Sequence, residues 1–262
     1  MSNPSDGQIK IFAGSASKVF VDKMCKYLET EPGKSYTHIF TEGSTYVRAD
    51  ESIRDKDVYI VQTIGKNPND SFMELIFWVD AFRRASANSI TAIIPYFGYA
   101  KADKKDEPRV SIRARVCADC IELCGCDRVL TMDLHAAQVQ GFFTKPVDHL
   151  YASSLLCEYA RRMGIVNDNL VVVSPDAGSA KRARAYANMI GCNVAIGDKV
   201  RLGHDENPNA LEIIGDVKGK TCMIVDDFTL SGNTLCKAAY GLMDKGAKGS
   251  LRIPFPCNPE ER

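Results

Sequence analysis

Short apolar runs alternate with helical segments along the whole chain, and this alternation constrains the fold more than any other feature. Strands are predicted at residues 9–13, 57–62, 90–95, 128–132, 170–173, 192–196 and 222–225, and helices at 19–28, 69–84, 111–124, 152–163, 181–190 and 234–245. Such alternation is typical of an α/β fold with a mostly parallel sheet flanked by helices. A length of 262 residues, 45% of them hydrophobic, allows two similar domains, which we place at 1–150 and 151–262.

Local signals predict further details of the first domain. Residues 38–47 are expected to form an extended hairpin, and residues 141–150 a loop that leads out of the domain. Ser71 and Glu74 have the spacing of a capping box at the start of a helix. Trp78 lies off the centre of that helix's apolar stripe, and we expect it to pack in the core or at an interface rather than to bind a ligand.

Charge and cysteine content argue against several classes of protein. The chain has 33 basic and 33 acidic residues, so its net charge does not favour nucleic acid or an anionic membrane as a partner. The first residues lack an apolar segment and no 18-residue apolar run occurs, which predicts a soluble, cytoplasmic protein with reduced cysteines. Cys117, Cys120 and Cys124 share one helical face as small hydrophobic residues, with zinc or an iron–sulfur cluster as the alternative.

The run from Lys220 to Lys237 is the most informative stretch for function. An apolar strand is followed by Asp226 and Asp227, then by a turn of small and hydroxyl-bearing residues, then by a helix. Carboxylates at the carboxyl end of a parallel strand can bind sugar hydroxyls or a cation. Backbone N–H groups at the start of a helix can bind a phosphate. A sugar phosphate would satisfy both features, and a strand that ends in solvated carboxylates is the alternative.

Two other strand ends carry residues of the same kind. Asp176, Gly178 and Ser179 follow the strand at 170–173 and precede a helix, so they form a second candidate anion site. Asp133 and His135 follow the strand at 128–132 and suit either a metal ion or a phosphate, although a lone histidine is often structural.

Clusters of cations occur at two places. Lys101, Asp103 and Lys104 lie in a charged loop directly after a predicted strand, where lysines can reach the phosphates of a nucleotide. Lys199 and Arg201 are two residues apart on an extended segment and therefore project to the same side, where both can meet one phosphate. The alternative in each case is a solvated surface segment.

Four of these segments together resemble the ribose-phosphate diphosphokinase family, also called phosphoribosyl-pyrophosphate (PRPP) synthetases, in its phosphate-dependent class. They are PYFGYAKADKKD, TMDLHAAQVQGFF, VSPDAGSAKRA and VDDFTLSGNT, in the family's order. The last also resembles the PRPP-binding motif of the type I phosphoribosyltransferase fold, but a simple transferase would leave the other three unexplained. The resemblance covers residues 9–248. It implies two domains of that fold, with the ATP side and oligomer contacts in the first and the ribose 5-phosphate site in the second.

The resemblance also implies a reaction, transfer of the β,γ-diphosphoryl group of MgATP to the C1 hydroxyl of ribose 5-phosphate. The products are PRPP, used in nucleotide biosynthesis, and AMP, and inorganic phosphate is an activator. Lys199 and Arg201 would be catalytic, and ATP would contact Phe40, Glu42, Lys101, Asp103, Lys104 and His135. Ribose 5-phosphate would contact Asp226, Asp227, Leu230, Ser231, Gly232, Asn233 and Thr234. The diphosphate loop would be Asp176, Ala177, Gly178, Ser179 and Lys181, and Mg²⁺ would meet Asp133, His135 and Asp176.

The chain departs from the family's pattern at several ATP positions and at its end. Lys101 and Ala102 stand where arginine and glutamine are usual, Ser44 replaces a glutamate, and Leu230 replaces an acidic residue. Family members continue for several dozen residues more, so we expect an incomplete second domain. Prolines in the last ten residues discourage any strand or helix after the one at 234–245.

Two hypotheses follow. The first is an active enzyme that forms a homo-oligomer, a dimer or a hexamer, because the family places the hairpin with Phe40 and Glu42 against a neighbouring subunit's ATP site. The second is a catalytically impaired relative that serves as a binding or regulatory subunit. Release of AMP that depends on ribose 5-phosphate, MgATP and inorganic phosphate would separate the two.

Overall fold

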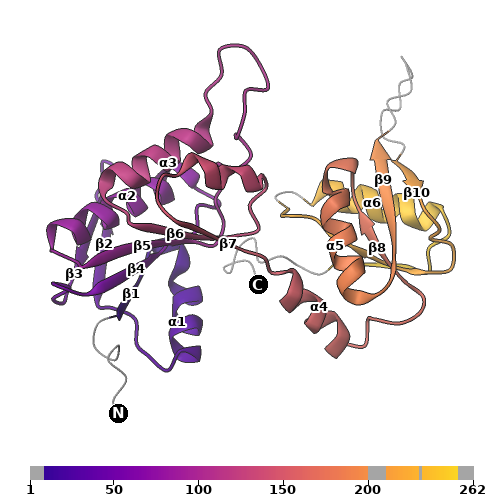
Figure 1. The fold of residues 1–262 in the computed structure, drawn as a ribbon, viewed down its shortest axis with the longest axis horizontal. Coiled ribbons are helices and arrows are strands. Elements are labelled where there is room, and N and C mark those ends of the chain that lie inside the picture. The colour runs from indigo at the N-terminus through magenta and orange to yellow at the C-terminus, as the bar shows by residue number, and fades with distance from the viewer. Residues whose placement is uncertain (1–8, 200–210, 230–231, 253–262) are drawn as a thin grey trace. The chain divides into compact units, whose positions relative to one another are not determined.

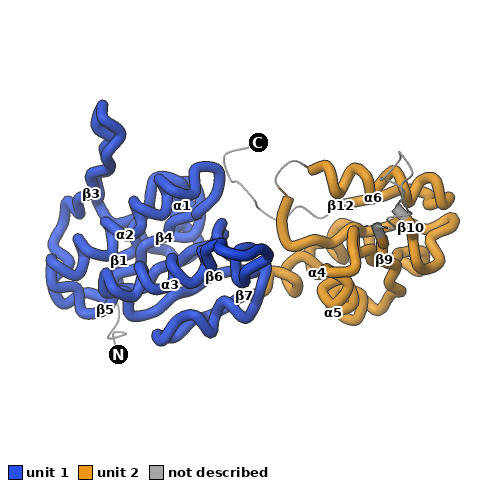
Figure 2. Tube along the Cα trace, turned by 90° about the horizontal axis from the view of Figure 1, so that it is seen from above, with its two compact units in different colours: residues 1–150, 258–262 blue, residues 151–257 orange. Residues whose placement is uncertain are grey.

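The chain folds into two compact units, one ending at Leu150 and the other beginning at Tyr151 (Figure 2). The computed structural model describes residues 9–199, 211–229 and 232–252. Each unit contains a five-stranded sheet with helices on its faces, so the predicted α/β class with mostly parallel sheets is confirmed. Within the described ranges, every helix is too short or too polar to cross a membrane.

The sheet of unit 1 is parallel throughout, in the order β1-β4-β5-β6-β7. Its strands are β1 (Ile9–Ala13), β4 (Asp57–Val61), β5 (Ser89–Ile94), β6 (Arg128–Met132) and β7 (Val147–Leu150). The central strands are apolar runs because helices cover both of their faces. A separate antiparallel hairpin, β2 (Ser35–Ile39) and β3 (Thr45–Ala49), projects from the unit (Figure 2).

Two helices, α2 (Pro68–Arg84) and α3 (Arg113–Cys124), cover one face of this sheet, and α1 (Lys18–Tyr27) covers the other (Figure 1). Trp78 of α2 is fully buried, with its ring centroid 5.2 Å from that of Phe82 and 6.1 Å from that of Phe12. The predicted packing role of Trp78 is therefore confirmed. A smaller cluster on the opposite face joins α1 to β1 and β4 through Val21, Cys25 and Ile11.

The capping box predicted for α2 is wrong. The helix begins at Pro68, so Ser71 and Glu74 lie inside it, and Glu74 is buried at 3% exposure. Its Oε1 accepts hydrogen bonds from the Ser15 backbone N–H at 2.9 Å and from Trp78 Nε1 at 3.3 Å. Its Oε2 accepts one from Gln62 Nε2 at 2.9 Å. The Glu74 carboxylate therefore accepts hydrogen bonds from long-range donors rather than capping the start of the helix, as the local pattern predicted.

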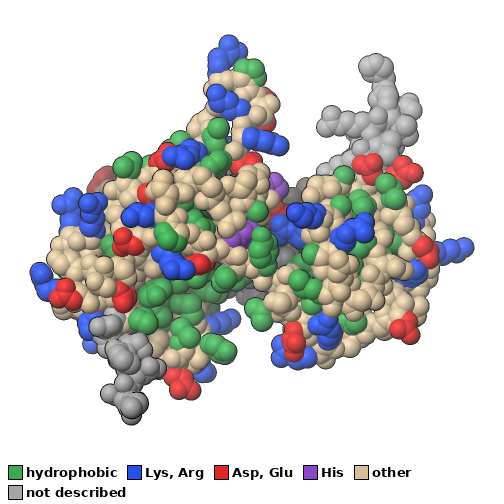
Figure 3. Space-filling model, in the orientation of Figure 1, with side chains coloured by type: hydrophobic (Ala, Val, Ile, Leu, Met, Phe, Trp, Pro, Cys, Tyr) green, Lys and Arg blue, Asp and Glu red, His purple; other side chains and the backbone are tan. Residues whose placement is uncertain are grey.

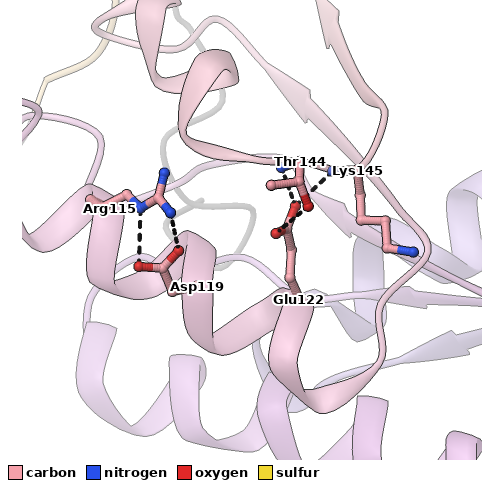
Figure 4. Close-up of polar contacts among 5 residues, drawn as sticks. All are labelled: Arg115, Asp119, Glu122, Thr144 and Lys145. Atoms are coloured by element: carbon pink, nitrogen blue, oxygen red, sulfur yellow. Dashed lines mark hydrogen bonds and ion pairs between the residues drawn. The ribbon is translucent and has the colours of Figure 1, made fainter.

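The loop predicted at residues 141–150 is also only partly right. A 3₁₀ helix, η2 (Ala137–Phe142), precedes β7, and β7 pairs in parallel with β6 at the edge of the sheet. The segment between them is fixed to α3 by Glu122 (Figure 4). Glu122 Oε1 accepts the backbone N–H of Thr144 at 2.6 Å and that of Lys145 at 2.7 Å. This anchor sets where β7 enters the sheet.

Unit 2 has a sheet in the order β10-β9-β8-β11-β12. The strands are β8 (Leu170–Ser174), β9 (Asn193–Lys199), β10 (Leu211–Ile214), β11 (Thr221–Ile224) and β12 (Gly249–Arg252), and only β10 runs antiparallel to its neighbour. One face is covered by α6 (Asn233–Asp244). The helices α4 (Ser153–Arg162) and α5 (Ala180–Ile190) lie on the other side of β8 and β9 (Figure 1).

Two strands of unit 2 were not predicted. The expectation that no strand follows the helix at 234–245 is wrong, because β12 pairs with β11 in parallel. The prolines stand after this strand, where they remove no hydrogen bond from it. The strand β10 lies in the charged segment after β9, where its short apolar run was not recognised.

The cysteines in the described parts of the chain are free thiols. Cys117 is buried as predicted, and burial raises its pKa to about 12. Cys120 and Cys124 of the same helix are only half-buried. Among the described residues, no three histidine, cysteine, aspartate or glutamate side chains are grouped to hold a metal ion.

Candidate functional site

In unit 2, two acidic turns lie side by side because the strands that precede them, β8 and β11, are neighbours and parallel. The first turn follows β8. Asp176 caps the 3₁₀ helix η3 (Ala177–Ser179), and its Oδ1 accepts the backbone N–H of Ser179 at 3.0 Å. Ser174 Oγ donates to the Asp176 carbonyl at 2.6 Å. The turn exposes Ala177 and Gly178, and exposed Lys181 follows in the first turn of α5.

The second acidic turn follows β11 and is joined to the first by a side-chain hydrogen bond. Ser179 Oγ donates to Asp226 Oδ1 at 3.1 Å. Within the second turn, Asp226 Oδ1 also accepts the backbone N–H of Asp227 at 2.9 Å. Asp227 Oδ1 in turn accepts the N–H of Phe228 at 3.0 Å. Ser179 of the predicted diphosphate loop and Asp226 of the predicted sugar site are therefore in direct contact.

Asp226 differs electrostatically from an ordinary surface carboxylate. The pKa of Asp226 is raised to about 6, mainly by burial and also by a hydrogen bond and like charge from the neighbouring Asp227. The hydrogen bond from Ser179 acts in the opposite direction, because it stabilises the ionised form. The ionised form of Asp226 is thus disfavoured until a ligand supplies hydrogen-bond donors or a cation.

The turn before α6 is described at Thr229 and from Gly232 onward. Thr229 Oγ1 accepts the backbone N–H of Gly232 at 3.1 Å, and Gly232 precedes the helix with φ of +75°, a left-handed conformation that glycine adopts readily. Asn233 and Thr234 begin the helix, where N–H groups have no partner within the helix. Leu230 and Ser231 lie outside the described residues.

The strand β9 ends at Lys199, and β9 is parallel to β8. The backbone of Lys199 is therefore at the edge of the sheet that also carries Asp176 and Asp226. Arg201, its predicted catalytic partner, lies outside the described part of the chain.

In unit 1, Asp133 and His135 follow β6 at the carboxyl edge of the sheet. Asp133 is half-buried and has a φ of +46°, which is uncommon for a residue with a side chain. Its backbone N–H donates to the Leu150 carbonyl of β7 at 2.9 Å. Leu134 is buried, and its N–H donates to His149 Nε2 at 2.9 Å, whereas the His135 side chain is exposed.

The charged loop after β5 carries the predicted ATP lysines. It rises from the unit between β5 and α3 (Figure 1), and Lys and Arg side chains gather on it (Figure 3). Lys101 and Lys104 are exposed, and Asp103 accepts a hydrogen bond from Gln138 Nε2 at 2.6 Å. This bond ties the loop to η2, next to the segment that holds Asp133 and His135. Ala102 is buried at 8% exposure, so its side chain offers no contact to a nucleotide.

The hairpin holds the other two predicted ATP residues away from the sheet. Phe40 is 45% exposed, with its ring centroid 4.9 Å from that of His38 and 6.3 Å from that of Tyr46. Ser44 Oγ donates to Glu42 Oε1 at 2.6 Å, which lowers the pKa of Glu42. The hairpin therefore presents an aromatic surface beside one carboxylate.

The residues present suit Mg²⁺ bound together with phosphate. Magnesium is usually held by one or two carboxylates and by substrate phosphates rather than by a cage of protein ligands. In unit 1, Asp133 supplies one half-buried carboxylate. A cluster of three protein ligands is not needed for such a site.

Two residues at these sites were missed by the sequence analysis. His149 and Gln138 support the predicted residues from other elements. Val147–Leu150 is short and does not alternate between apolar and polar residues, and a proline and charged residues nearby favoured a loop over a strand that carries His149.

Comparison with known proteins gives consistent matches across the chain. The family described as the N-terminal domain of ribose phosphate pyrophosphokinase matches residues 9–125. The family described as the phosphoribosyl transferase domain matches residues 154–260.

Individual relatives match both units at once. The ribose-phosphate pyrophosphokinase of Agrobacterium fabrum is 44% identical over 91% of this chain and 76% of its own length. That of Campylobacter jejuni is 46% identical over 92% of this chain and 77% of its own length. The crystal structure of phosphoribosylpyrophosphate synthetase from Mycobacterium smegmatis matches with a TM-score of 0.87 at 35% identity, covering 95% of this chain and 83% of that one.

Proposed function

The chain belongs to the ribose-phosphate pyrophosphokinase family of enzymes, and we propose that it transfers the β,γ-diphosphoryl group of MgATP to the C1 hydroxyl of ribose 5-phosphate. The products are PRPP for nucleotide biosynthesis and AMP. The resemblance drawn from four short motifs is thereby confirmed at the level of the family. A single observation on this chain's own residues supports the proposal. The acidic turns at the ends of β8 and β11 are joined by a hydrogen bond.

The acceptor sugar is bound by unit 2 in this proposal. Asp226 and Asp227 accept hydrogen bonds from ribose hydroxyls, and the turn from Leu230 to Thr234 binds the 5-phosphate through backbone N–H groups at the start of α6. Bound hydroxyls donate to Asp226 and favour its ionised form, which burial otherwise disfavours. The loop from Asp176 to Lys181 lies beside them and receives the diphosphate.

The donor nucleotide is bound by unit 1. Exposed Lys101 and Lys104 neutralise phosphate charge, and Phe40 offers an aromatic face for the base while Glu42 offers an acceptor. Asp133 and His135 are the residues of this unit that would hold Mg²⁺ with the phosphates of ATP, and the ion would neutralise charge that develops on the transferred group.

No covalent intermediate with the protein is required. Diphosphoryl transfer needs in-line positioning of the sugar hydroxyl and cations where negative charge spreads in the transition state. Lys199 and Arg201 supply those cations in this proposal, and inorganic phosphate is an activator, as in the family's phosphate-dependent class.

We also propose a homo-oligomer, a dimer or a hexamer, that works in the cytoplasm, where ATP is available. The support is the projecting hairpin, on which the exposed aromatic residues Phe40, Tyr36 and Tyr46 lie close to one another. Such a surface is better covered by another subunit than left in water.

The test is release of AMP by the purified protein, with MgATP, ribose 5-phosphate and inorganic phosphate each omitted in turn. We expect AMP only when ATP, Mg²⁺ and ribose 5-phosphate are all present. A folded protein that binds ribose 5-phosphate by calorimetry but releases no AMP above background would instead be a binding or regulatory subunit.

A further inference from the structure

The turn from Asp133 to His135 depends on a residue of the neighbouring strand. The register of β6 and β7 places Thr131 opposite His149 and Met132 opposite Leu150. One residue beyond this pairing, the Asp133 N–H still donates to the Leu150 carbonyl at 2.9 Å. The chain then turns away from the sheet, so Leu134 has no strand partner for its own N–H.

The imidazole of His149 fills that place. Its Nε2 accepts the Leu134 N–H at 2.9 Å. Nε2 accepts this bond, so that nitrogen carries no proton in the contact. The side-chain nitrogen of Gln140, on η2, lies 3.3 Å from Nδ1 and donates to the Ala137 carbonyl at 2.9 Å. His149 is thus bonded to the turn and lies beside the 3₁₀ helix that follows it.

The backbone at Asp133 needs such support. A φ of +46° lies in the left-handed region, which a residue with a side chain keeps only where surrounding contacts fix it. The hydrogen bonds on either side, from Asp133 to β7 and from Leu134 to His149, fix it here. Burial of Leu134 at 5% exposure holds the middle of the turn in the core, which leaves the side chain of His135 exposed.

We propose that His149 is a positioning residue for the nucleotide site: its Nε2 fixes the turn that orients Asp133 and His135 toward MgATP. This inference rests on the function proposed above. His149 itself is not placed against substrate, so its loss changes the geometry of the turn rather than the charge of the site. The loss should therefore weaken binding of MgATP and leave binding of ribose 5-phosphate unchanged.

Three variants of the full chain test this role. His149→Leu removes the acceptor at similar side-chain size, and His149→Gln retains an acceptor oxygen at the end of a side chain of comparable reach. Asp148→Asn is the matched control, because Asp148 is the preceding residue of β7 and pairs with Arg128 at 2.5 Å and 2.9 Å rather than with the turn. Calorimetry gives the Kd of each variant for MgATP and for ribose 5-phosphate.

We expect His149→Leu to raise the Kd for MgATP about tenfold, the ratio that corresponds to about 1.4 kcal/mol. Its Kd for ribose 5-phosphate should stay within about twofold of the wild type, and His149→Gln and Asp148→Asn should bind MgATP within about threefold of it. An unchanged MgATP affinity in His149→Leu would overturn the proposal. So would a His149→Gln or Asp148→Asn variant that binds as weakly as His149→Leu.

Hydrogen exchange provides a second measurement that does not require a foldable leucine variant. In the wild type, the Leu134 amide should be protected from exchange, and in His149→Gln it should remain so. A wild-type Leu134 amide that exchanges at the rate of a free peptide group would refute the role of His149 outright. Neither measurement requires turnover. A wild-type protein that is inactive, but that binds MgATP normally and has a protected Leu134 amide, would therefore refute the proposed function without contradicting this inference.

Discussion

The hydroxyl of Ser179 donates a hydrogen bond to Oδ1 of Asp226 at 3.1 Å, although the two residues lie 47 positions apart in the chain. The contact exists because β8 and β11 are adjacent parallel strands whose carboxyl ends meet at the same edge. It joins the loop proposed to bind diphosphate to the carboxylates proposed to bind ribose. A substitution at Ser179 should therefore change the affinity for ribose 5-phosphate.

Ser179→Ala should weaken ribose 5-phosphate binding about fivefold to tenfold, since a hydrogen bond to a charged group is worth about 1 kcal/mol or more. The loss also removes a bond that favours ionised Asp226, so the pKa of Asp226 should rise further. Ser179→Thr keeps the hydroxyl and is the control. Calorimetric titration gives the affinity of both variants for ribose 5-phosphate. Equal affinities in the alanine variant and the wild type would contradict the link between Ser179 and the sugar site.

Asp226→Asn should stabilise the protein at neutral pH while it impairs sugar binding. Burial raises the pKa of Asp226 to about 6 in the folded chain, above its value of about 3.9 in an unfolded chain. The folded state then binds more protons than the unfolded state between these values, and stability falls as the pH rises through that window. Because Asp226 is part-exposed, we expect a gain of about 1 kcal/mol for Asp226→Asn at pH 8.

The stability measurement is urea unfolding of wild type and Asp226→Asn at pH 8 and at pH 4. The difference in free energy of unfolding should disappear at pH 4, where Asp226 of the wild type is already largely protonated. A difference that is the same at both pH values would show that the raised pKa is not its source.

The affinity for ribose 5-phosphate should fall as Asp226 takes up a proton. With a pKa of about 6, roughly nine in ten Asp226 side chains are protonated at pH 5, which predicts a loss of up to about tenfold relative to pH 7.5. The phosphate of the ligand also titrates near pH 6, so the dependence is compared with that of Asp226→Asn. Parallel curves for the two proteins would rule out a contribution from Asp226.

Lys199→Ala should lower turnover by a hundredfold or more and leave ribose 5-phosphate binding intact. Loss of a group that stabilises developing charge costs about 2.7–4 kcal/mol of the barrier. Lys220→Ala is the control, because Lys220 precedes β11 at the opposite edge of the same sheet and pairs with Asp216 at 2.9 Å. Single-turnover measurement of AMP release reports the effect, and near-normal turnover in Lys199→Ala would remove that lysine from the mechanism.

Glu74→Gln should destabilise unit 1 by about 2 kcal/mol, because the new amide group would face donors from Ser15, Gln62 or Trp78 inside the core. The same substitution at Glu122 is the control. Glu122 Oε1 alone accepts both backbone N–H groups, and the Thr144 hydroxyl at Oε2 can accept from an amide (Figure 4). Thermal unfolding should therefore show a loss of less than about 1 kcal/mol for Glu122→Gln, and equal losses would contradict the account of Glu74.

The fold class and the family could be predicted from the sequence because both depend on local signals. Buried strands read as apolar runs, and the motifs around Asp133, Asp176 and Asp226 each lie within a few residues directly after such a run. The carboxyl ends of parallel strands all lie at one edge of a sheet, so each motif is expected at that edge of its own sheet. Elements with mixed signals, such as β7 and β12, were missed, since a strand at a sheet edge needs only a short apolar pattern.

Which distant residues support those motifs depends on the tertiary fold. The sequence determined that Asp226 and Ser179 follow strands, but the pairing of β11 with β8 decided that their side chains meet. Likewise, the pairing of β7 with β6 gave Leu134 an acceptor in His149, and folding of α2 onto β1 and β4 turned Glu74 from an apparent helix cap into a buried acceptor. Hydrogen-bond partners of this kind depend on strand order and register, which a local pattern does not encode.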